Sequence, residues 1–456
     1  MTDKTTIAAI STPMGTGGVG IIRISGEKAM EITDKIFRSF SGKALADSEG
    51  YKAHYGRIFD GETAVDEAIC LVFRAPHSYT GENVVEINCH GGVFLTKKIL
   101  RLVLANGASP AAPGEFTKRA FLNGKMDLSK AEGVMSLISA QGEQGANAAY
   151  NLLEGSLSRK IEEINSSLLS VAAHLAAWVD YPDDEIEEID ENNLRNTVQA
   201  ALDKINLLLS RFDSGMAVTT GVDTAIVGKP NVGKSTLMNL LTGYDRSIVT
   251  AVEGTTRDVV EETVNLDGCI LRLSDTAGMR ETGDIVEKIG VDRSRKKLER
   301  AAVIFAVFDL SRELSSEDLE LIEMCKGRTV IPIINKTDLD RKADISVIEN
   351  TLGKCVAISA KDGDGYGELC EKVTTLIGTK DFDSSAAMLA NERQRLCCEN
   401  AVASLNEALE AIDFGLTLDA IGVCIDGAIA ALLELTGQKA SEAVVDEVFR
   451  QFCVGK

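Results

Sequence analysis

Apolar side chains recur every three or four residues in two separated parts of the chain, residues 130–212 and 388–452. This is the spacing of amphipathic helices, whose apolar positions line one face. The first part contains the series Leu152, Leu157, Ile161, Ile164, Leu168, Val171 and Leu175, and the second contains Leu396, Leu405, Leu409, Ile412, Leu432, Leu435, Val444 and Val448. Both parts therefore predict long helices with one buried face.

The part between them has a different pattern, in which short β-branched runs alternate with helical stretches. Such runs are typical of parallel strands that are buried on both faces and joined by crossover helices. They lie at residues 224–228, 270–273, 302–308, 330–334 and 355–358. Because insertions are tolerated where two chain ends lie close together, the pattern predicts an α/β domain inserted between two halves of one helical domain.

The first 118 residues predict a mixed α/β domain, with strands at 7–10, 20–24, 68–73 and 84–88. The chain of 456 residues is therefore expected to be multidomain, α/β plus all-α. The predicted domains are an N-terminal domain at 1–118, the first helical half at 119–216, the inserted α/β domain at 217–378 and the second helical half at 379–456.

The net charge is strongly negative, with 48 basic against 69 acidic side chains, a balance of −21. A broad basic surface for nucleic acid is therefore not expected. Residues 180–191 form the most acidic stretch, which predicts a solvated loop or helix cap in preference to a metal site. The most basic run, Arg293, Arg295, Lys296, Lys297 and Arg300, is explained most simply as a solvated helix face.

The sequence lacks the signals of an exported or membrane-spanning protein, and this predicts the cellular compartment. The first ten residues show no basic-then-apolar export signal, and no apolar run reaches about 18 residues. Ten cysteines without such a signal predict a reducing, cytoplasmic environment. No Cys-x-x-Cys pair occurs and the four histidines are scattered, so structural zinc is not expected.

Two glycine-rich runs invite a nucleotide-binding interpretation, and only one supports it. Gly15 to Gly20 has the glycine spacing of a dinucleotide fingerprint, but it leads into the strand-like run 21–24 where a helix is required, so it predicts a turn. Residues 228–235, Gly-Lys-Pro-Asn-Val-Gly-Lys-Ser, follow a predicted strand and precede a helix. That order creates a phosphate-binding loop, in which Lys234 reaches the β- and γ-phosphates and Ser235 ligates Mg²⁺.

Four further motifs follow in the order of a GTPase. Residues 255–258 contain the threonine that completes the metal shell, and Asp275 to Gly278 follow a predicted strand where they reach Mg²⁺ and the γ-phosphate. Asp338, in Asn335-Lys-Thr-Asp338, presents two acceptors to guanine, which adenine cannot satisfy, and residues 359–361 back the guanine O6. The predicted GTP-binding residues are Asn231, Val232, Gly233, Lys234, Ser235, Thr236, Thr250, Ala251, Val252, Glu253, Gly254, Thr255, Thr256, Asp275, Thr276, Ala277, Gly278, Asn335, Lys336, Asp338, Ser359, Ala360 and Lys361.

The position after Gly278 indicates an unusual hydrolytic mechanism. Many small GTPases place a glutamine there to orient the attacking water, whereas this chain has Met279. Asn231 offers an oxygen beside the phosphates where a monovalent cation can neutralise developing charge. Glu287 is a candidate base acting through a water, and a surface helix residue is the alternative interpretation.

The GTPase motifs resemble those of the MnmE (TrmE) family of tRNA-modification GTPases, and the resemblance extends over nearly the whole chain. It rests on residues 228–235, 250–258, 275–280 and 284–287, with 20–26, 79–82, 90–92 and 113–125 upstream and 452–456 downstream. Runs 113–125 and 452–456 are specific to the family, because general GTPases contain neither. The resemblance implies an N-terminal folate-binding and dimerisation domain, a split helical domain and an inserted Ras-like G domain in a homodimer.

The resemblance also implies site residues. K⁺ would lie on Asn231, Thr250, Val252 and Thr255, and Mg²⁺ on Ser235 and Thr256, while Glu287 helps to activate water. 5-formyl-tetrahydrofolate, or a related tetrahydrofolate, would contact Arg23, Glu86, Lys125 and Lys456. Basic side chains suit the folate carboxylates, and Glu86 suits the pterin N–H groups. Cys453 is a candidate for one-carbon chemistry beside Lys456, and packing at a dimer interface is the alternative.

The partner implied by the resemblance is a flavin-dependent MnmG-type protein, with which the family installs an aminomethyl-type group at C5 of the tRNA wobble uridine. The acidic balance of the chain predicts that most tRNA contact belongs to that partner. Two other functions fit part of the sequence: a ribosome-assembly or translation switch that uses GTP as a timer, and a folate enzyme with a regulatory G domain. Switches of the first kind usually carry a basic RNA-binding domain, which residues 379–456 do not resemble.

Overall fold

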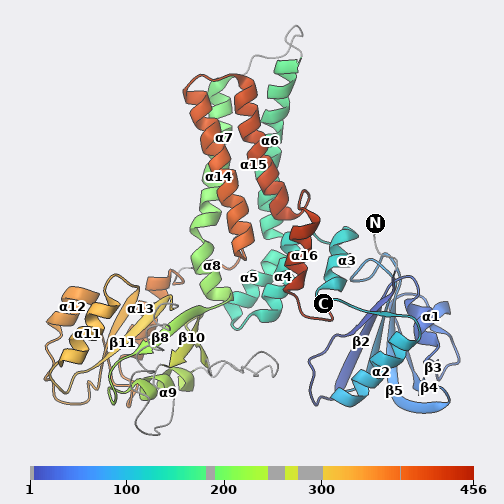
Figure 1. Cartoon of the computed structure of the whole chain (residues 1–456), viewed down its shortest axis with the longest axis horizontal. Helices are drawn as coiled ribbons and strands as arrows, with labels where there is room; N and C mark the ends of the chain where they lie inside the picture. The colour runs from blue at the N-terminus through green and yellow to red at the C-terminus, as the bar shows by residue number, and fades with distance from the viewer. Residues whose placement is uncertain (1–4, 181–189, 245–261, 276–300, 381) are drawn as a thin grey trace. The chain divides into compact units, whose positions relative to one another are not determined.

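The computed structural model of the chain describes residues 5–180, 190–244, 262–275, 301–380 and 382–456 (Figure 1). The chain folds into two compact units. Unit 1 comprises residues 1–135, 161–186 and 417–456, and unit 2 comprises 136–160 and 187–416. Each unit thus joins segments that are far apart in the sequence.

Unit 1 is built on a seven-stranded sheet with the strand order β3-β4-β5-β6-β2-β1-β7. The central strands β1, β2, β5 and β6 pair antiparallel, and only the short β7 runs parallel to β1. The strands are β1 (Ile7–Ile10), β2 (Val19–Ser25), β3 (Phe37–Ser39), β4 (Lys52–Asp60), β5 (Thr63–Phe73), β6 (Val84–His90) and β7 (Ser109–Pro110).

Helices α1 (Ala29–Asp34) and α2 (Val93–Ala105) contribute to the main core of this sheet, together with side chains such as Ile22, Ile87 and Ile99 that are fully buried. A second, smaller cluster forms around Phe116 of α3 (Glu115–Leu122) and includes Ile7 and Ala9. Since Ile22 and Ile24 lie in the first cluster and Arg23 contacts Phe116, the two clusters lie on opposite faces of β2. The remaining helices of unit 1 are α4 (Leu128–Ser139), α6 (Ser156–Asp180), α15 (Leu418–Thr436) and α16 (Glu442–Arg450), with the ends of α4 and α6 in unit 2.

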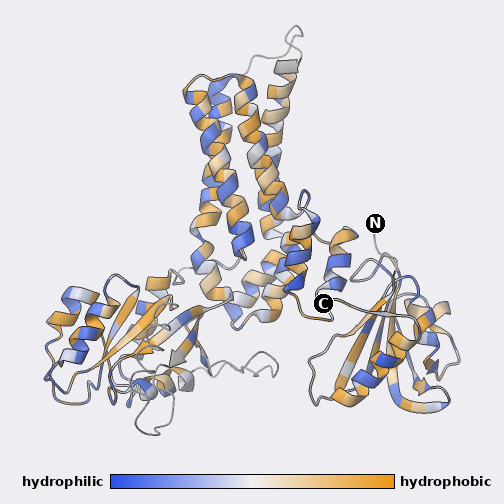
Figure 2. Cartoon of the chain, viewed as in Figure 1, coloured by the Kyte–Doolittle hydropathy of each residue, from blue (hydrophilic) through white to orange (hydrophobic). Residues whose placement is uncertain are grey.

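Unit 2 contains a six-stranded sheet with the order β13-β12-β11-β8-β10-β9. All neighbouring strands run parallel except β9, which pairs antiparallel with β10 at the edge. The strands are β8 (Val222–Val227), β9 (Glu262–Leu266), β10 (Cys269–Asp275), β11 (Val303–Asp309), β12 (Val330–Asn335) and β13 (Val356–Ile358). Every residue of β11 is buried, as expected of a central strand with helices on both sides. The central strands of this sheet are coloured mostly hydrophobic in Figure 2.

Two hydrophobic clusters cover the two faces of this sheet. One includes Leu237 and Leu241 of α9 (Lys234–Tyr244) and Leu369 of α13 (Tyr366–Ile377), and the other includes Ile322 of α11 (Ser316–Cys325) and Ile348 of α12 (Ser346–Leu352). The arrangement is a doubly wound α/β sheet. Unit 2 also contains α5 (Glu143–Leu153), α7 (Glu191–Ser210), α8 (Phe212–Thr219) and α14 (Glu392–Asp413), of which α7 and α14 pack together over many residues.

The observed elements confirm the predicted multidomain α/β plus all-α class. All five predicted strands of the middle domain are present and parallel, while the edge strand β9 was missed because Glu262 to Leu266 alternates apolar and polar side chains instead of forming an apolar run. The short strands β3 and β7 and the long β4 were also not predicted. Gly15 to Gly18 lie in an irregular segment with bends and Gly20 lies in β2, so no helix follows the glycines and the prediction that this run is not a dinucleotide fingerprint is confirmed.

The predicted helices are present, but not all of their predicted apolar positions are buried. Leu157, Ile161 and Leu405 are completely buried, whereas Leu396 is 56% exposed. Half-buried positions are Val171, Leu409, Ile412, Val444 and Val448. Asp190 caps α7 by accepting from the Asn192 N–H, as expected for the end of the acidic stretch. The predicted domain boundaries stay predictions, and the one at residue 217 falls inside α8. In the parts of the chain that the structure describes, no helix is both long and apolar enough to span a bilayer.

Candidate functional site: a phosphate-binding loop and a basic cluster at the chain end

The phosphate-binding loop connects β8 to α9, as the motif predicts. Gly228 and Gly233 have φ angles of +155° and +97°, and Asn231 lies in the left-handed region at +62°. Glycine is required at position 233 because its backbone conformation strains a residue with a side chain. The loop therefore presents its backbone N–H groups at the N-terminus of α9, where the helix dipole attracts anions.

Lys234 is the first residue of α9 and is only 7% exposed. Its ammonium donates to the carbonyl oxygens of Gly228 at 2.8 Å and Lys229 at 2.7 Å. These bonds keep the positively charged ammonium of Lys234 beside the loop, where it can bind phosphate oxygens. Asn231, Ser235 and Thr236 are exposed at the surface of the loop, whereas Val232 is buried in the core beneath it.

Asn335, at the end of β12, ties the phosphate loop to a distant segment. Its side-chain Nδ2 donates to the carbonyl oxygen of Val232 at 2.8 Å, and its Oδ1 accepts from the Ala360 N–H at 3.0 Å. A Cβ added to Gly233 would lie 2.1 Å from the same Nδ2. Gly233 is thus required for close approach as well as for backbone conformation.

The predicted guanine-binding residues gather around this amide. The Ser359 hydroxyl contacts Asp338 Oδ1 and Asp362 Oδ2 at 3.0 Å each, which links the Asn335–Asp338 and Ser359–Lys361 loops. Asp338 and Lys361 are exposed, while Ser359 is 1% exposed. A carboxylate held at the surface between two loops is suited to accept from the N1 and N2 hydrogens of guanine.

Lys336 has a partner that the sequence motif did not indicate. Its ammonium lies 2.7 Å from Asp309 Oδ2, and Asp309, the last residue of β11, is 5% exposed. Burial alone would raise the pKa of Asp309, but hydrogen bonds from Lys336 and Ser311 outweigh burial and lower that pKa. Lys336 itself has a left-handed backbone conformation, at a φ of +66°, and its side chain is fixed by the ion pair with Asp309. A carboxylate at the end of a parallel strand was the only signal in the sequence.

A second missed contact anchors the phosphate loop from outside. Lys229 Nζ contacts the Ser315 hydroxyl and lies 3.4 Å from Asp318 Oδ2, at the N-terminal capping box of α11. Asp318 is 4% exposed. The side chain of Lys229 thus joins α11 to the loop, while its carbonyl oxygen accepts from Lys234.

The remaining predicted GTP and metal positions are only partly described. Asp275 ends β10 and pairs in register with Ile226, so this strand end lies beside the phosphate loop. The other predicted residues lie outside the described residues; they are Thr250, Ala251, Val252, Glu253, Gly254, Thr255, Thr256, Thr276, Ala277, Gly278, Met279 and Glu287. The basic run from Arg293 to Arg300 lies outside them as well. In the described ranges, no group of three or more His, Cys, Asp and Glu side chains is arranged to hold a metal ion.

Three of the four predicted folate contacts come together in unit 1. Arg23 of β2 and Glu86 of β6 are cross-strand neighbours, and Arg23 Nε donates to Glu86 Oε1 at 2.8 Å. The Arg23 guanidinium also donates to the Gly455 carbonyl oxygen at 3.3 Å, which brings the chain end onto the sheet. Burial, followed by the charge of Arg23, lowers the pKa of Lys456 despite the opposing effect of Glu86.

Lys125, the fourth predicted folate contact, and Cys453, the candidate for one-carbon chemistry, have other partners in unit 1. Lys125 Nζ donates to the Pro76 carbonyl oxygen at 3.2 Å, and its stem packs near Gly81. Cys453 is exposed, and its carbonyl oxygen accepts from the Gly114 and Lys456 N–H groups. The structure thus places Arg23, Glu86 and Lys456 together, with Cys453 on the same C-terminal segment.

The donor sets fit the implied groups to different degrees. Arg23, Lys456 and Glu86 combine two cations with one acceptor in a half-buried cluster, which suits a ligand that has both carboxylates and N–H donors. Ser235 offers an exposed hydroxyl in the first turn of α9, as an Mg²⁺ ligand must. For K⁺, only Asn231 is among the described residues, and it is exposed with its side chain at the loop surface.

A doubly wound sheet, a glycine-rich loop at a helix N-terminus and an Asn-Lys-x-Asp loop beside it define a P-loop GTPase domain. Two family models match the chain. "GTP-binding protein TrmE N-terminus" matches residues 6–125, before the GTPase domain, and "MnmE helical domain" matches residues 128–453, which include that domain. The chain belongs to the MnmE (TrmE) family.

Curated relatives match the chain over its entire length. The tRNA modification GTPase MnmE of Alkaliphilus oremlandii is 44% identical over 99% of both chains, and that of Geobacillus kaustophilus is 44% identical over 100% of both. Among solved structures, the G domain of the T. maritima FeoB iron transporter is 30% identical and covers 34% of this chain and 98% of its own, with a TM-score of 0.27.

Proposed function

We propose that this GTPase of tRNA modification is stimulated by potassium and works with a flavin-dependent MnmG-type partner. Together they add an aminomethyl or carboxymethylaminomethyl group at C5 of the tRNA wobble uridine, with a tetrahydrofolate as the one-carbon donor. The observation that carries the proposal is the match to MnmE relatives over 99–100% of the chain, combined with the phosphate loop and the basic cluster described above.

In the GTPase half of the proposal, each described residue has a distinct task. Lys234 moves its ammonium from loop carbonyls to the β- and γ-phosphates, and Asp338 selects guanine. Asn335 keeps the two loops at a constant spacing. Ser235 and Thr256 would hold Mg²⁺, which neutralises phosphate charge when bound.

Water activation differs from that in GTPases with a catalytic glutamine. Asn231, Thr250, Val252 and Thr255 would hold K⁺, and Glu287 would orient the attacking water, since Met279 can do neither. Pairing of two G domains in a homodimer would complete this arrangement. Thr250, Val252, Thr255 and Glu287 lie outside the described residues, so these roles rest on the family motif.

In the folate half, Arg23, Lys125 and Lys456 would bind the carboxylates and Glu86 the pterin ring. Support comes from the ion pair between Arg23 and Glu86 and from Lys456 beside it. Cys453 remains a candidate for one-carbon chemistry. The tRNA would be contacted mainly through the partner, because the chain carries a net charge of −21, and the complex would act in the cytoplasm.

Turnover of GTP in potassium and in sodium tests the cation requirement. We expect turnover at least tenfold faster in potassium, in line with the contribution of about 10³–10⁵ that a charge-neutralising group makes in related enzymes. Lys234→Met is the control that should be inactive in both salts. Equal rates in the two salts would remove the cation from the mechanism. Mass spectrometry of wobble nucleosides from cells lacking the protein tests the modification, which should be absent.

A further inference from the structure

Arg23 is held by aromatic rings as well as by Glu86. The guanidinium carbon lies 5.4 Å from the ring centre of Tyr79 and 5.6 Å from that of Phe116, which is completely buried. The Tyr79 hydroxyl is 2.8 Å from Thr117 Oγ1, so the loop before β6 and helix α3 are joined at this point. The position of Arg23 therefore depends on where α3 lies over the sheet.

Helix α3 also holds the C-terminal segment. The Gly114 N–H donates to the Cys453 carbonyl oxygen at 3.3 Å, and the Phe116 N–H donates to the Lys456 carbonyl oxygen at 3.2 Å. There is no room for a side chain at the start of the helix, since a Cβ on Gly114 would lie 2.6 Å from the Phe449 carbonyl oxygen. The start of α3 thus determines the position of Lys456 as well as of Arg23.

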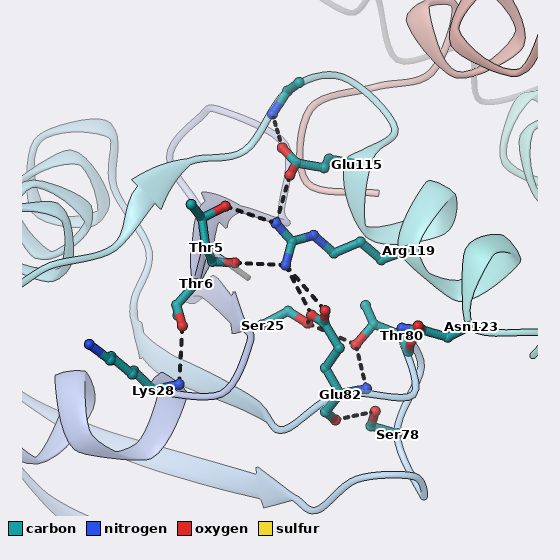
Figure 3. Close-up of polar contacts among 11 residues, drawn as sticks. Thr5, Thr6, Ser25, Lys28, Ser78, Thr80, Glu82, Glu115, Arg119 and Asn123 are labelled. Carbon is teal, nitrogen blue, oxygen red and sulfur yellow. Dashed lines mark hydrogen bonds and ion pairs between the residues drawn. The ribbon is translucent and has the colours of Figure 1, made fainter. Parts of the chain in front are cut away.

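A polar network around the buried Arg119 joins α3 to neighbouring segments of unit 1, as Figure 3 shows. Arg119, on the last turn of α3, is 7% exposed. Its Nη1 contacts both carboxylate oxygens of Glu82 at 3.2 Å and the Thr5 carbonyl oxygen at 2.8 Å, and its Nη2 contacts Glu115 Oε1 at 2.9 Å. One guanidinium therefore connects three segments of unit 1.

The carboxylate of Glu82 is fixed from its other side. The completely buried Ser25 donates from its hydroxyl to Glu82 Oε2 at 2.7 Å, and its hydroxyl also lies 2.7 Å from Thr80 Oγ1. Ser25 lies two residues from Arg23 on β2, so both side chains are on the same face of the sheet. The Asn123 side chain donates to the Thr80 carbonyl oxygen at 2.7 Å and closes the network at the end of α3.

From this chain of contacts we infer that Arg119 and Glu82 are positioning residues for the anion-binding cluster formed by Arg23 and Lys456. They do so by fixing helix α3, whose Phe116 ring stacks on Arg23 and whose N-terminus holds the 453–456 segment. The inference rests on the proposed folate function for its ligand. It assigns a role to two residues of the runs 79–82 and 113–125 that are neither predicted GTP-binding residues nor predicted folate contacts.

Only arginine satisfies every acceptor in this network. Its planar guanidinium presents donors in several directions at once, whereas lysine carries one ammonium on a flexible stem and cannot contact Thr5, Glu82 and Glu115 together. Arg119→Lys keeps the charge but loses the geometry. Glu82→Gln keeps the shape and the acceptor for Ser25 but loses the negative charge.

The test measures two properties of the full-length protein: binding of 5-formyl-tetrahydrofolate by calorimetry and hydrogen exchange of the amides at Gly114, Phe116 and the 453–456 segment. For Arg119→Lys we expect affinity about tenfold weaker and amide exchange about tenfold faster, and for Glu82→Gln the same direction. The matched control is Arg57→Lys, which alters the exposed Arg57–Glu67 pair on the same sheet and should leave both properties unchanged.

A coupling measurement separates positioning from general loss of structure. If Arg119 acts through Arg23, then Arg119→Lys should weaken binding much less in an R23K background than in the parent, because the two effects share one contact. Additive losses, or unchanged amide exchange in both Arg119→Lys and Glu82→Gln, would overturn the inference. If the parent protein binds no folate, the proposed folate function fails, and the exchange rates alone still decide whether Arg119 fixes α3 and the chain end.

Discussion

The side-chain amide of Asn335 donates to the carbonyl oxygen of Val232, 103 residues earlier in the chain, and this bond joins the phosphate loop to the loop that is predicted to bind guanine. The other end of the same amide accepts from the Ala360 N–H. Asn335 is 2% exposed, so neither bond is replaced by water if it is lost. The predicted base-binding and phosphate-binding loops therefore share one structural element.

Asn335→Asp is expected to weaken GTP binding about 10- to 100-fold. The substitution keeps the shape of the side chain but replaces the donor with a second acceptor, which opposes the Val232 carbonyl oxygen in a buried site and costs about 1–3 kcal/mol or more. Fluorescent GTP titration measures the change. Asn239→Asp on the exposed surface of α9 is the control and should bind normally. Normal affinity of the Asn335 variant would show that the bridge is dispensable.

Gly233→Ala should abolish measurable GTP binding. Its φ angle of +97° is strained for alanine, and the added Cβ would lie 2.1 Å from Asn335 Nδ2. Strain of about 2–3 kcal/mol alone corresponds to roughly a 100-fold loss of affinity. Gly243→Ala is the matched substitution in α9, the helix that follows the loop, where nothing lies within 4 Å, and it should raise stability by about 0.5–1 kcal/mol. Binding by the Gly233 variant within tenfold of the parent would contradict the geometry.

Lys229→Met should weaken GTP binding about three- to tenfold, with little effect on folding. The variant leaves Asp318 without its cation at the start of α11 and frees the loop segment whose carbonyl oxygen holds Lys234. Lys326→Met removes an exposed pair with Glu323 at the other end of α11 and provides the comparison. Release rates of labelled GTP give the readout, and identical rates for both variants would exclude a role for Lys229.

Folate binding should weaken as the pH rises through a value below the ordinary lysine pKa of 10.5. Burial and the charge of Arg23 lower the pKa of Lys456, so its charged form, which binds carboxylates, is lost earlier in alkali than that of an exposed lysine. The folded state binds the Lys456 proton less tightly than the unfolded state does. The free energy of unfolding should therefore rise with pH over the same range in which the affinity for folate falls. Calorimetric titrations of 5-formyl-tetrahydrofolate from pH 7 to 10 follow the effect.

Lys456→Arg is the control for this pH dependence. Arginine keeps its charge throughout the range, so the variant should bind with a constant affinity up to about pH 10. A parallel decline in the parent and the variant would assign the titration to the ligand instead of to Lys456.

The sequence predicted the parts of the site that depend on local order. The phosphate loop was predictable because residues 228–235 follow a β-branched strand and open a helix, and because glycine at 233 permits a backbone that other residues resist. The strands β8, β10, β11, β12 and β13 were predictable because buried parallel strands are apolar along their whole length. The edge strand β9 was not predicted, because an alternation of polar and apolar side chains over only five residues is a weak signal.

Other parts depended on residues that meet only after folding. Asp309 is one of many carboxylates in the sequence, and only the parallel pairing of β11 with β12 brings it to Lys336. Arg119 and Glu82 belong to separate motifs whose relationship becomes visible when α3 lies beside Thr5 and the loop that precedes β6. No spacing in the sequence indicates these pairs, because contact across a sheet has no constant distance along the chain.

The amino-acid sequence by itself therefore determined the class of protein. Phosphate binding uses one contiguous backbone loop, so the residues that form it are consecutive in the sequence. Tertiary structure alone decided which side chains hold that loop and the chain end in place. Arg23 and Gly455 are 432 positions apart and are joined by one hydrogen bond. Such a contact follows from the packing of a whole unit, in which each buried polar group must find its partner wherever the fold brings one.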